Sequence, residues 1–347
     1  MIAKTISLMK FVGIVSGLVL ALALPSTAQS PVPQKDRYTV YLAVWRGCEE
    51  ACEGFVNYIE ENEVPADVIV RDADRDKEKL KEFVKEVRET KPDLVVTWGT
   101  SVTDGMIGPK DTDHPDEFIG EIPSLFMIVA DPVGAKIVDS YESSGRPMVT
   151  GTRNRVPVEV QLKAMQEYRP FKRFAIIYNE NELNSRLNAE AVRQAAHELK
   201  LDLLQLSLPL YDGKPSVDDI PKLIQEAADQ GAEFLFIGSS SFLQVNADLY
   251  NETATRLGIP VATSYASMVS DNGALLAIAS KYGLVGRLAG YQAKRILVDK
   301  VPPIDLPIAS LDRHSYIINI ETADKLKLYP PISLLNYAEI VGTIGAQ

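Results

Sequence analysis

A short motif near the start of the chain combines two cysteines with an arginine and several acids. It reads WRGCEEACEGF, with Cys48 and Cys52 four residues apart and Arg46 just before them. Thiols at such a spacing could hold a metal ion, carry out redox chemistry or form a local disulfide. The spacing is one residue longer than that of a thioredoxin-like CxxC pair, which excludes that redox motif.

A second candidate site is a turn rich in small and hydroxyl residues. The segment TWGTSVTDG places Thr100 and Ser101 after an apolar segment and at the start of a predicted helix. The first backbone N–H groups of a helix lack partners within it, and together with the helix dipole they favour a carboxylate or another anion. The alternative is that the two hydroxyls simply cap the helix, a role compatible with anion binding.

Other polar side chains follow further apolar segments and could reach the same ligand. These candidates are Asp131, Asn179, Asn184, Ser185, Ser240 and Tyr265. The asparagines offer both donors and an acceptor for hydrogen bonds. Asp131 could instead cap the turn that follows it. The ring of Tyr265 could stack on a planar ligand, or it could lie at the edge of a loop without contact.

The elements that must position these side chains alternate between short apolar strands and longer amphipathic helices. The first series has predicted strands at 38–45, 66–72, 92–100 and 122–132 and predicted helices at 49–62 and 76–90. The second series has predicted helices at 156–170, 183–200, 217–231 and 242–257 and predicted strands at 171–180, 201–208, 232–241 and 259–264. This alternation indicates βαβ units and parallel sheets. The same alternation begins again in the second series. This favours an α/β fold of two doubly wound lobes with a crevice between them over a single large sheet.

The N-terminus and the charge balance restrict the class of protein. Residues 1–28 carry Lys4 and Lys10, then an apolar run and small Ser26 and Ala28, so they are predicted to be a signal peptide that exports the chain to the periplasm. The chain has 36 Lys and Arg against 47 Asp and Glu, for a net charge of −11. This acidic balance argues against nucleic acid as a partner.

In an exported chain, the two cysteines favour a Cys48–Cys52 disulfide over a metal site. Zinc usually takes four ligands, and the three histidines of the chain show no partner spacing. The sequence contains no GxSxG, HExxH or Walker motif. We therefore predict no catalytic residue, no cofactor and no metal.

Seven segments spread along the chain carry a resemblance to a known family. They are Gly54–Phe55, PDLVVTWGT (92–100), VADPVGAKIV (129–138), VTGT (149–152), IIYNENELNS (176–185), GALLAIASKYGLVGRLAG (273–290) and YIINIETADKLKL (316–328). In this order they resemble the extracytoplasmic substrate-binding proteins of ABC importers with the type I periplasmic-binding fold. The branch they resemble includes tryptophan- and aromatic-amino-acid-binding members.

The resemblance implies an organisation and a function. Three strands would cross between the lobes as a hinge, near 148–153, near 279–282 and within 301–310. Lobe one would hold 37–150 and 283–299, and lobe two 151–280 and 305–330. The protein would capture a small molecule between the lobes and hand it to the permease of an ABC transporter. Alternatives are delivery of ligand occupancy to a membrane sensor and a secreted enzyme on the same scaffold.

The chain differs from the amino-acid-binding relatives where an ammonium group would bind. Those relatives commonly carry an acid after the strand that matches FLFIG, and often another after the one that matches IPVAT. This chain has SSS and TSY there, and burying an ammonium without a counter-charge is costly. Arg46 and Arg153 could instead bind a carboxylate through two parallel hydrogen bonds, or each could form an ion pair at the surface or between the lobes. The predicted ligand is aromatic or carboxylate-bearing.

Overall fold

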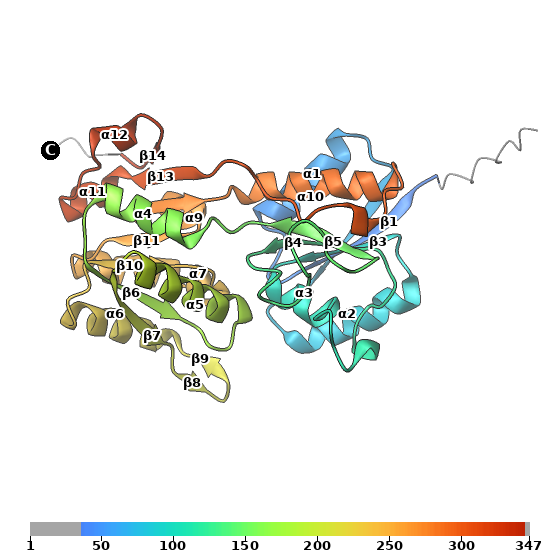
Figure 1. Ribbon diagram of the computed structural model, residues 1–347, viewed down its shortest axis with the longest axis horizontal. Helices are drawn as coiled ribbons and strands as arrows, with labels where there is room; N and C mark the ends of the chain where they lie inside the picture. The colour runs from blue at the N-terminus through green and yellow to red at the C-terminus, as the bar shows by residue number, and fades with distance from the viewer. Residues whose placement is uncertain (1–35, 344–347) are drawn as a thin grey trace, which may run out of the picture. The chain divides into compact units, whose positions relative to one another are not determined.

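The computed structural model describes residues 36–343, so the predicted signal peptide lies outside the described part of the chain. From Arg37 onward the chain forms one compact unit. It contains a five-stranded sheet in the order β2-β1-β3-β4-β5 and a seven-stranded sheet in the order β14-β13-β12-β11-β10-β6-β7 (Figure 1). Among the helices of the described residues, none is long and apolar enough to cross a membrane.

The five-stranded sheet is parallel throughout and is built from the first part of the chain. Its strands are β1 (Tyr38–Val44), β2 (Ala66–Asp72), β3 (Leu94–Trp98), β4 (Ser124–Val129) and β5 (Val149–Arg153). The helices between them are α1 (Glu50–Glu61), α2 (Lys77–Thr90), α3 (Thr100–Met106) and the 3₁₀ turn η1 (Pro115–Glu117). Figure 1 shows α1 on one face of the sheet and α2 and α3 on the other. Every residue of β3 and β4 is buried, as expected for parallel strands covered on both faces.

The seven-stranded sheet is parallel except where β12 and β13 run antiparallel. Its strands are β6 (Arg173–Tyr178), β7 (Asp202–Ser207), β10 (Phe234–Ile237), β11 (Val261–Thr263), β12 (Leu276–Ala279), β13 (Ser315–Asn319) and β14 (Glu339–Val341). Its helices are α4 (Val158–Tyr168), α5 (Leu183–Glu198), α6 (Ile220–Asp229), α7 (Ser241–Val245), α8 (Ala247–Arg256), α9 (Ala266–Ser270), α11 (Ile320–Leu326) and α12 (Ile332–Leu335). A small hairpin, β8 (Leu210–Tyr211) with β9 (Lys214–Pro215), and the turn η2 (Val217–Asp219) precede α6.

The chain passes between the two sheets three times, and the fold class predicted from the sequence is confirmed. The first passage leads from β5 to α4, and the second from β12 to α10 (Tyr282–Leu297), which packs against α1, β4 and β5. The third runs from α10 through the turn η3 (Pro303–Asp305) to β13. The first and third passages pair with each other, because the N–H of Arg153 donates to the carbonyl of Ala309 at 2.9 Å and the N–H of Ala309 donates to that of Gly151 at 3.0 Å. Residues 151–153 were expected to belong to lobe two. In the structure they pair with β4 and so belong to the five-stranded sheet.

Two further details differ from the prediction. The helix predicted over 242–257 is two helices, α7 and α8, which are separated at Asn246. The side chain of Asn246 donates to the carbonyl oxygen of Phe242 at 2.8 Å and so competes with a continuous helix. The tail after residue 330, to which the sequence assigned no role, adds β14 to the edge of the seven-stranded sheet beside β13.

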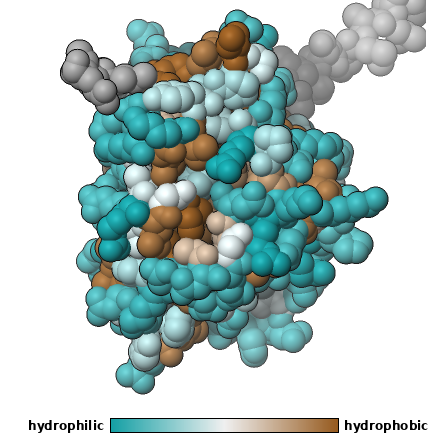
Figure 2. All heavy atoms as spheres, turned by 90° about the vertical axis from the view of Figure 1, so that its left-hand side faces the viewer, coloured by the Kyte–Doolittle hydropathy of each residue, from teal (hydrophilic) through white to brown (hydrophobic). Residues whose placement is uncertain are grey.

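The C-terminal tail leaves several large apolar side chains exposed. They are Tyr329, Ile332, Leu335, Tyr337 and Ile340. Figure 2 looks at the side of the molecule that carries α12 and β14, and it shows apolar groups among a mostly polar surface. Tyr337 is anchored, since its ring packs edge-on against Tyr316 and its hydroxyl bonds Glu167 at 2.9 Å.

Helices α1 and α10 touch backbone to backbone through glycines. A Cβ atom on Gly54 would lie 2.1 Å from the carbonyl oxygen of Gly283, and one on Gly286 would lie 2.0 Å from the carbonyl oxygen of Ala51. No side chain fits at such distances, so these positions require glycine. This contact places α10, which lies between β12 and β13 of the seven-stranded sheet in the sequence, against the five-stranded sheet.

Gly286→Ala should therefore destabilise the protein. Overpacking against backbone atoms costs about 2–3 kcal/mol of the free energy of unfolding, more than the gain in helix propensity returns. Gly283→Ala is the matched control, because a Cβ there would lie 3.6 Å from the carbonyl oxygen of Glu50, an ordinary contact. Chemical denaturation of both variants compares them directly. Equal stabilities would contradict the close approach of the two helices.

Candidate ligand-binding site

A small cavity lies between the turns that follow the strands of the two sheets. Its volume is about 30 Å³, and we call it the central cavity. The five-stranded side supplies Trp45, Arg46, Trp98, Gly99, Thr100, Ser101 and Ile128, and the seven-stranded side supplies Asn184, Ser239, Ser241, Gln244 and Tyr265. Asn154 and Tyr282, from the first two passages between the sheets, complete the lining. The cavity thus lies where ligands bind in open α/β sheets, outside the carboxyl ends of the strands.

Arg46 joins the two sides of the central cavity. Its buried guanidinium pairs with Glu49, with Nε 2.6 Å from Oε1 and Nη2 3.1 Å from Oε2. The same Nη2 donates to the Oε1 of Gln244 on α7 at 2.7 Å. Burial is the largest single influence and lowers the pKa of Arg46, but the hydrogen bond and charge of Glu49, together with Tyr265 and Tyr282, raise it overall, so the side chain stays protonated. Arg46 therefore does form an ion pair, but with a residue three positions along the chain and with its side chain only 8% exposed, not at the surface or between the lobes as the alternative held.

Three buried polar atoms of the lining have no hydrogen-bond partner. They are Nη1 of Arg46, Nε1 of Trp98 and Oδ1 of Asn154. The guanidinium of Arg46 lies over the Trp98 ring, 5.1 Å from its centroid. A buried polar atom without a partner costs about 1–3 kcal/mol, which a ligand that supplies the partner would recover. Two of these three atoms are donors, Nη1 of Arg46 and Nε1 of Trp98. They point to a ligand that carries a strong acceptor.

The backbone at the cavity adopts unusual conformations in two places. Gly99 has φ +85°, and its N–H donates to the carbonyl oxygen of Met127 at 2.8 Å. Ile128, a β-branched residue, has φ +58° at an irregularity in the pairing of β4 with β5. Positive φ is strained for such a residue, and strain of this kind collects at functional sites.

Glu182 is a carboxylate beside the site that the sequence reasoning missed. It accepts hydrogen bonds from the hydroxyl of Ser240 and from the N–H groups of Ser241 and Phe242, each at 2.9 Å. Burial raises its pKa above the usual 4.5, although these hydrogen bonds and the charge of Arg46 act in the opposite direction. The sequence could have indicated this residue, since Glu182 lies within the segment NENELNS, which supplied the candidates Asn179, Asn184 and Ser185. Both carboxylate oxygens of Glu182 already accept hydrogen bonds from within the protein.

Five of the ten predicted ligand-binding residues line the central cavity. They are Arg46, Thr100, Ser101, Asn184 and Tyr265. Three others support loops nearby without lining it. The side chain of Asn179 accepts from the N–H of Asn181, the hydroxyl of Ser185 accepts from the N–H of Asn179, and the N–H of Ser240 donates to the Tyr265 hydroxyl.

The remaining two predicted residues lie outside the lining and have other partners. Asp131 accepts from the N–H of Gly134 at 2.8 Å, the capping role considered as its alternative, and it pairs with Arg155 at 3.0 Å. Arg153 stacks on Tyr141, with its guanidinium carbon 4.1 Å from the ring centroid. In the structure these two residues connect the first passage between the sheets to the loop after β4.

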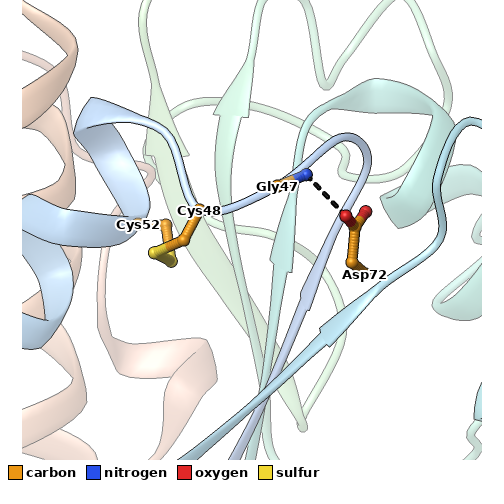
Figure 3. Close-up of a disulfide and its surroundings, with 4 residues drawn as sticks. All are labelled: Gly47, Cys48, Cys52 and Asp72. Carbon is orange, nitrogen blue, oxygen red and sulfur yellow. Dashed lines mark hydrogen bonds between the residues drawn. A yellow bond between two sulfur atoms is a disulfide. The ribbon is translucent and has the colours of Figure 1, made fainter.

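The disulfide between Cys48 and Cys52 is present, as the sequence predicted. Its Cα atoms are 5.1 Å apart, and it joins the turn after β1 to the first turn of α1 (Figure 3). On the other side of this turn, the N–H of Gly47 donates to Asp72 at 2.9 Å. Before Arg46, the N–H of Arg75 donates to the carbonyl oxygen of Trp45 at 2.8 Å, so the turn that carries Arg46 is held on both sides. Nowhere in residues 36–343 are three or more His, Cys, Asp or Glu side chains grouped so that they could hold a metal ion.

Known structures share this arrangement of two α/β lobes. A conserved domain protein from Vibrio cholerae superposes with a TM-score of 0.77 at 19% identity, covering 89% of this chain and 100% of that one. An ABC domain from Streptococcus pneumoniae, solved in complex with L-Trp, gives a TM-score of 0.76 at 18% identity, covering 88% and 99%. At these identities the likeness shows the fold, which is that of the periplasmic ligand-binding proteins.

Sequence comparison gives the family. Residues 46–341 match the family described as ABC transporter substrate binding protein, and the chain belongs to it. An uncharacterised protein of Rickettsia prowazekii is 20% identical over 264 residues, or 75% of each chain. The family is one of binding proteins without catalytic activity, in agreement with the absence of catalytic motifs from the sequence.

The raised pKa of Glu182 leads to a pH dependence of stability. Because the folded protein holds this proton more tightly than the unfolded chain, the contribution of Glu182 to the free energy of unfolding is complete below about pH 4.5 and is lost as the pH rises through the folded-state pKa. The stability of the wild type relative to Glu182→Gln should therefore fall as the pH rises from 4.5. Urea denaturation of both proteins over this range measures it, and a relative stability that rises with pH would contradict the dominance of burial.

Removal of the disulfide should leave the fold intact. The entropy estimate for so small a loop gives a loss of about 2 kcal/mol in the free energy of unfolding for Cys48→Ser/Cys52→Ala. Because the two sheets do not depend on this bond, circular dichroism should be unchanged while the melting temperature falls. Free thiols in the native exported protein, or a variant that fails to fold, would contradict this account.

Proposed function

We propose that this protein captures an aromatic or carboxylate-bearing small molecule in the periplasm and delivers it to the permease of an ABC transporter. The family supports the transport role. The ligand class rests on one observation, the pair of buried donors without partners, Nη1 of Arg46 and Nε1 of Trp98, at the central cavity. A carboxylate would accept from both. The neighbour from Streptococcus pneumoniae, whose ligand L-Trp is aromatic and bears a carboxylate, is consistent with this class.

Capture requires the two sides of the cavity to separate. The central cavity has a volume of about 30 Å³, whereas pockets for small ligands range from roughly 300 to 1,000 Å³. We propose that the two sheets and their helices act as lobes, 37–153 with 283–299 and 154–280 with 305–330, which open and close on the three connecting passages. The hydrogen bond from Arg46 to Gln244 would break on opening and re-form, or give way to the ligand, on closure.

Arg46 and Trp98 should carry the affinity. In wild-type protein, we expect indole-3-propionate to raise the melting temperature, because binding to the folded state adds RT ln(1 + [L]/Kd), about 2.7 kcal/mol at a hundred times Kd. Calorimetry should show that Arg46→Gln and Trp98→Phe each weaken binding by about 1–3 kcal/mol, the value of a buried hydrogen bond.

Arg153→Gln is the matched control for this experiment. Arg153 was also predicted to bind the ligand, but in the structure it stacks on Tyr141 outside the cavity lining. Its loss should leave the affinity unchanged. Equal losses for Arg46→Gln and Arg153→Gln would argue against a ligand in the central cavity.

A further inference from the structure

Two arginines occupy the first passage between the sheets, outside the central cavity. Arg153 ends β5, and Arg155 follows two residues later. Their partners lie in the loop after β4, since Arg153 stacks on Tyr141 and Arg155 pairs with Asp131. His314, the last residue before β13, adds an imidazole from the third passage. We call these five residues the arginine cluster.

Four buried nitrogen atoms of the arginine cluster have no hydrogen-bond partner. They are Nε and Nη2 of Arg155, Nε of Arg153 and Nδ1 of His314. A buried polar atom without a partner is costly, above all when it belongs to a charged group. Most such atoms in folded proteins are satisfied. Several of them in one cluster indicate that a further group belongs there.

The free atoms of Arg155 have the geometry of an anion-binding fork. Arg155 uses only the Nη1 end of its guanidinium, which lies 3.0 Å from Oδ2 of Asp131. Nε and Nη2 lie on the other edge and donate in parallel, which suits two oxygens of one anion. Arg46 shows this use of the same edge, because its Nε and Nη2 bind the two oxygens of Glu49. No residue in 36–343 meets this edge of Arg155 in that way.

The arginine cluster carries more positive than negative charge. Asp131 pairs with Arg155 alone, and among residues 36–343 no carboxylate forms an ion pair with Arg153. Burial lowers the pKa of Arg155 although Asp131 acts in the opposite direction, and the charge of Arg153 adds to the lowering. Burial and Arg153 also lower the pKa of His314. Glu142 acts on Arg153 only from an exposed position. An anion between the two guanidinium groups would relieve this excess charge.

We propose that the arginine cluster binds a small inorganic oxyanion, phosphate or sulfate, between the guanidinium groups of Arg153 and Arg155. Two of its oxygens would accept from Nε and Nη2 of Arg155, and a third from Nε of Arg153. The donors are buried, so a small ion reaches them where a protein partner does not. Neither arginine lines the central cavity, and the site goes beyond the proposed function and does not depend on it. The ion would join the first passage to its neighbours.

Inorganic phosphate is the probe for this site. At constant ionic strength, with chloride as the balancing anion, phosphate at about ten times Kd should raise the melting temperature of the wild type by roughly 2–3 °C. Arg155→Lys keeps the charge but loses the fork, so calorimetry should show a loss of at least about ten-fold in phosphate affinity. Arg153→Lys removes the single Nε donor and should cause a smaller loss.

Arg71→Lys is the matched control. The same edge of Arg71 is occupied by Glu86, with Nε 3.1 Å and Nη2 2.7 Å from Oε1. This substitution therefore also removes an arginine fork, but one that is already satisfied, and the phosphate affinity should stay unchanged. Circular dichroism and melting in phosphate-free buffer check the folding of each variant. If Arg155→Lys fails to fold, the comparison of Arg153→Lys with Arg71→Lys decides.

Three results would overturn the proposal. The first is a wild type that phosphate and sulfate stabilise no more than chloride does. The second is an equal rise in melting temperature for the wild type, Arg155→Lys and Arg153→Lys, which would show only the general effect of these salts on protein surfaces. The third is displacement of phosphate by indole-3-propionate, which would place the ion in the central cavity rather than at the arginine cluster.

Discussion

The close contact between α1 and α10 is the constraint on which the arrangement of the site depends. Helix α10 follows β12 of the seven-stranded sheet, yet its glycines bring it against the backbone of α1 on the other sheet. Its first residue, Tyr282, lines the central cavity. The same contact fixes the start of α1, which carries Glu49, Glu50 and Glu53. The polar groups at the start of both helices are therefore held in place by a contact in which the two backbones touch at Gly54, Gly283 and Gly286.

Charge around the site is arranged in compensated units. Arg46 is balanced by Glu49 and hydrogen-bonded to Gln244, and Glu182 is held by donors at the N-terminus of α7. The side chain of Arg46 is only 8% exposed, and a charge so placed is tolerated only because its partners are fixed in advance. What remains for a ligand are single unpaired atoms rather than whole charged groups. A site of this kind selects by the direction of its hydrogen bonds as much as by net charge.

The sequence predicted the fold more completely than the site. The spacing of apolar residues that marks a strand or a helix is a property of a short segment of the chain. The order of elements and both parallel sheets could therefore be predicted from segments such as those of β1 and α2. Half of the predicted ligand-binding residues line the cavity because the carboxyl ends of parallel strands must meet at one edge. Glu182, Gln244 and Tyr282 were missed, since their positions depend on how the lobes pack. Asp131 and Arg153 have the right place in the chain, but partners outside the site hold them.

The pairing of the first and third passages has a mechanical consequence. Two chain segments joined side by side by hydrogen bonds between Gly151, Arg153 and Ala309 form a narrow ribbon rather than two separate tethers. A ribbon bends easily across its flat face and resists shear between its edges. The second passage, at 279–282, is a separate support. Together they would reduce the relative motion of the lobes to a rotation about one axis, so that every opening returns to the same alignment of Arg46 with α7.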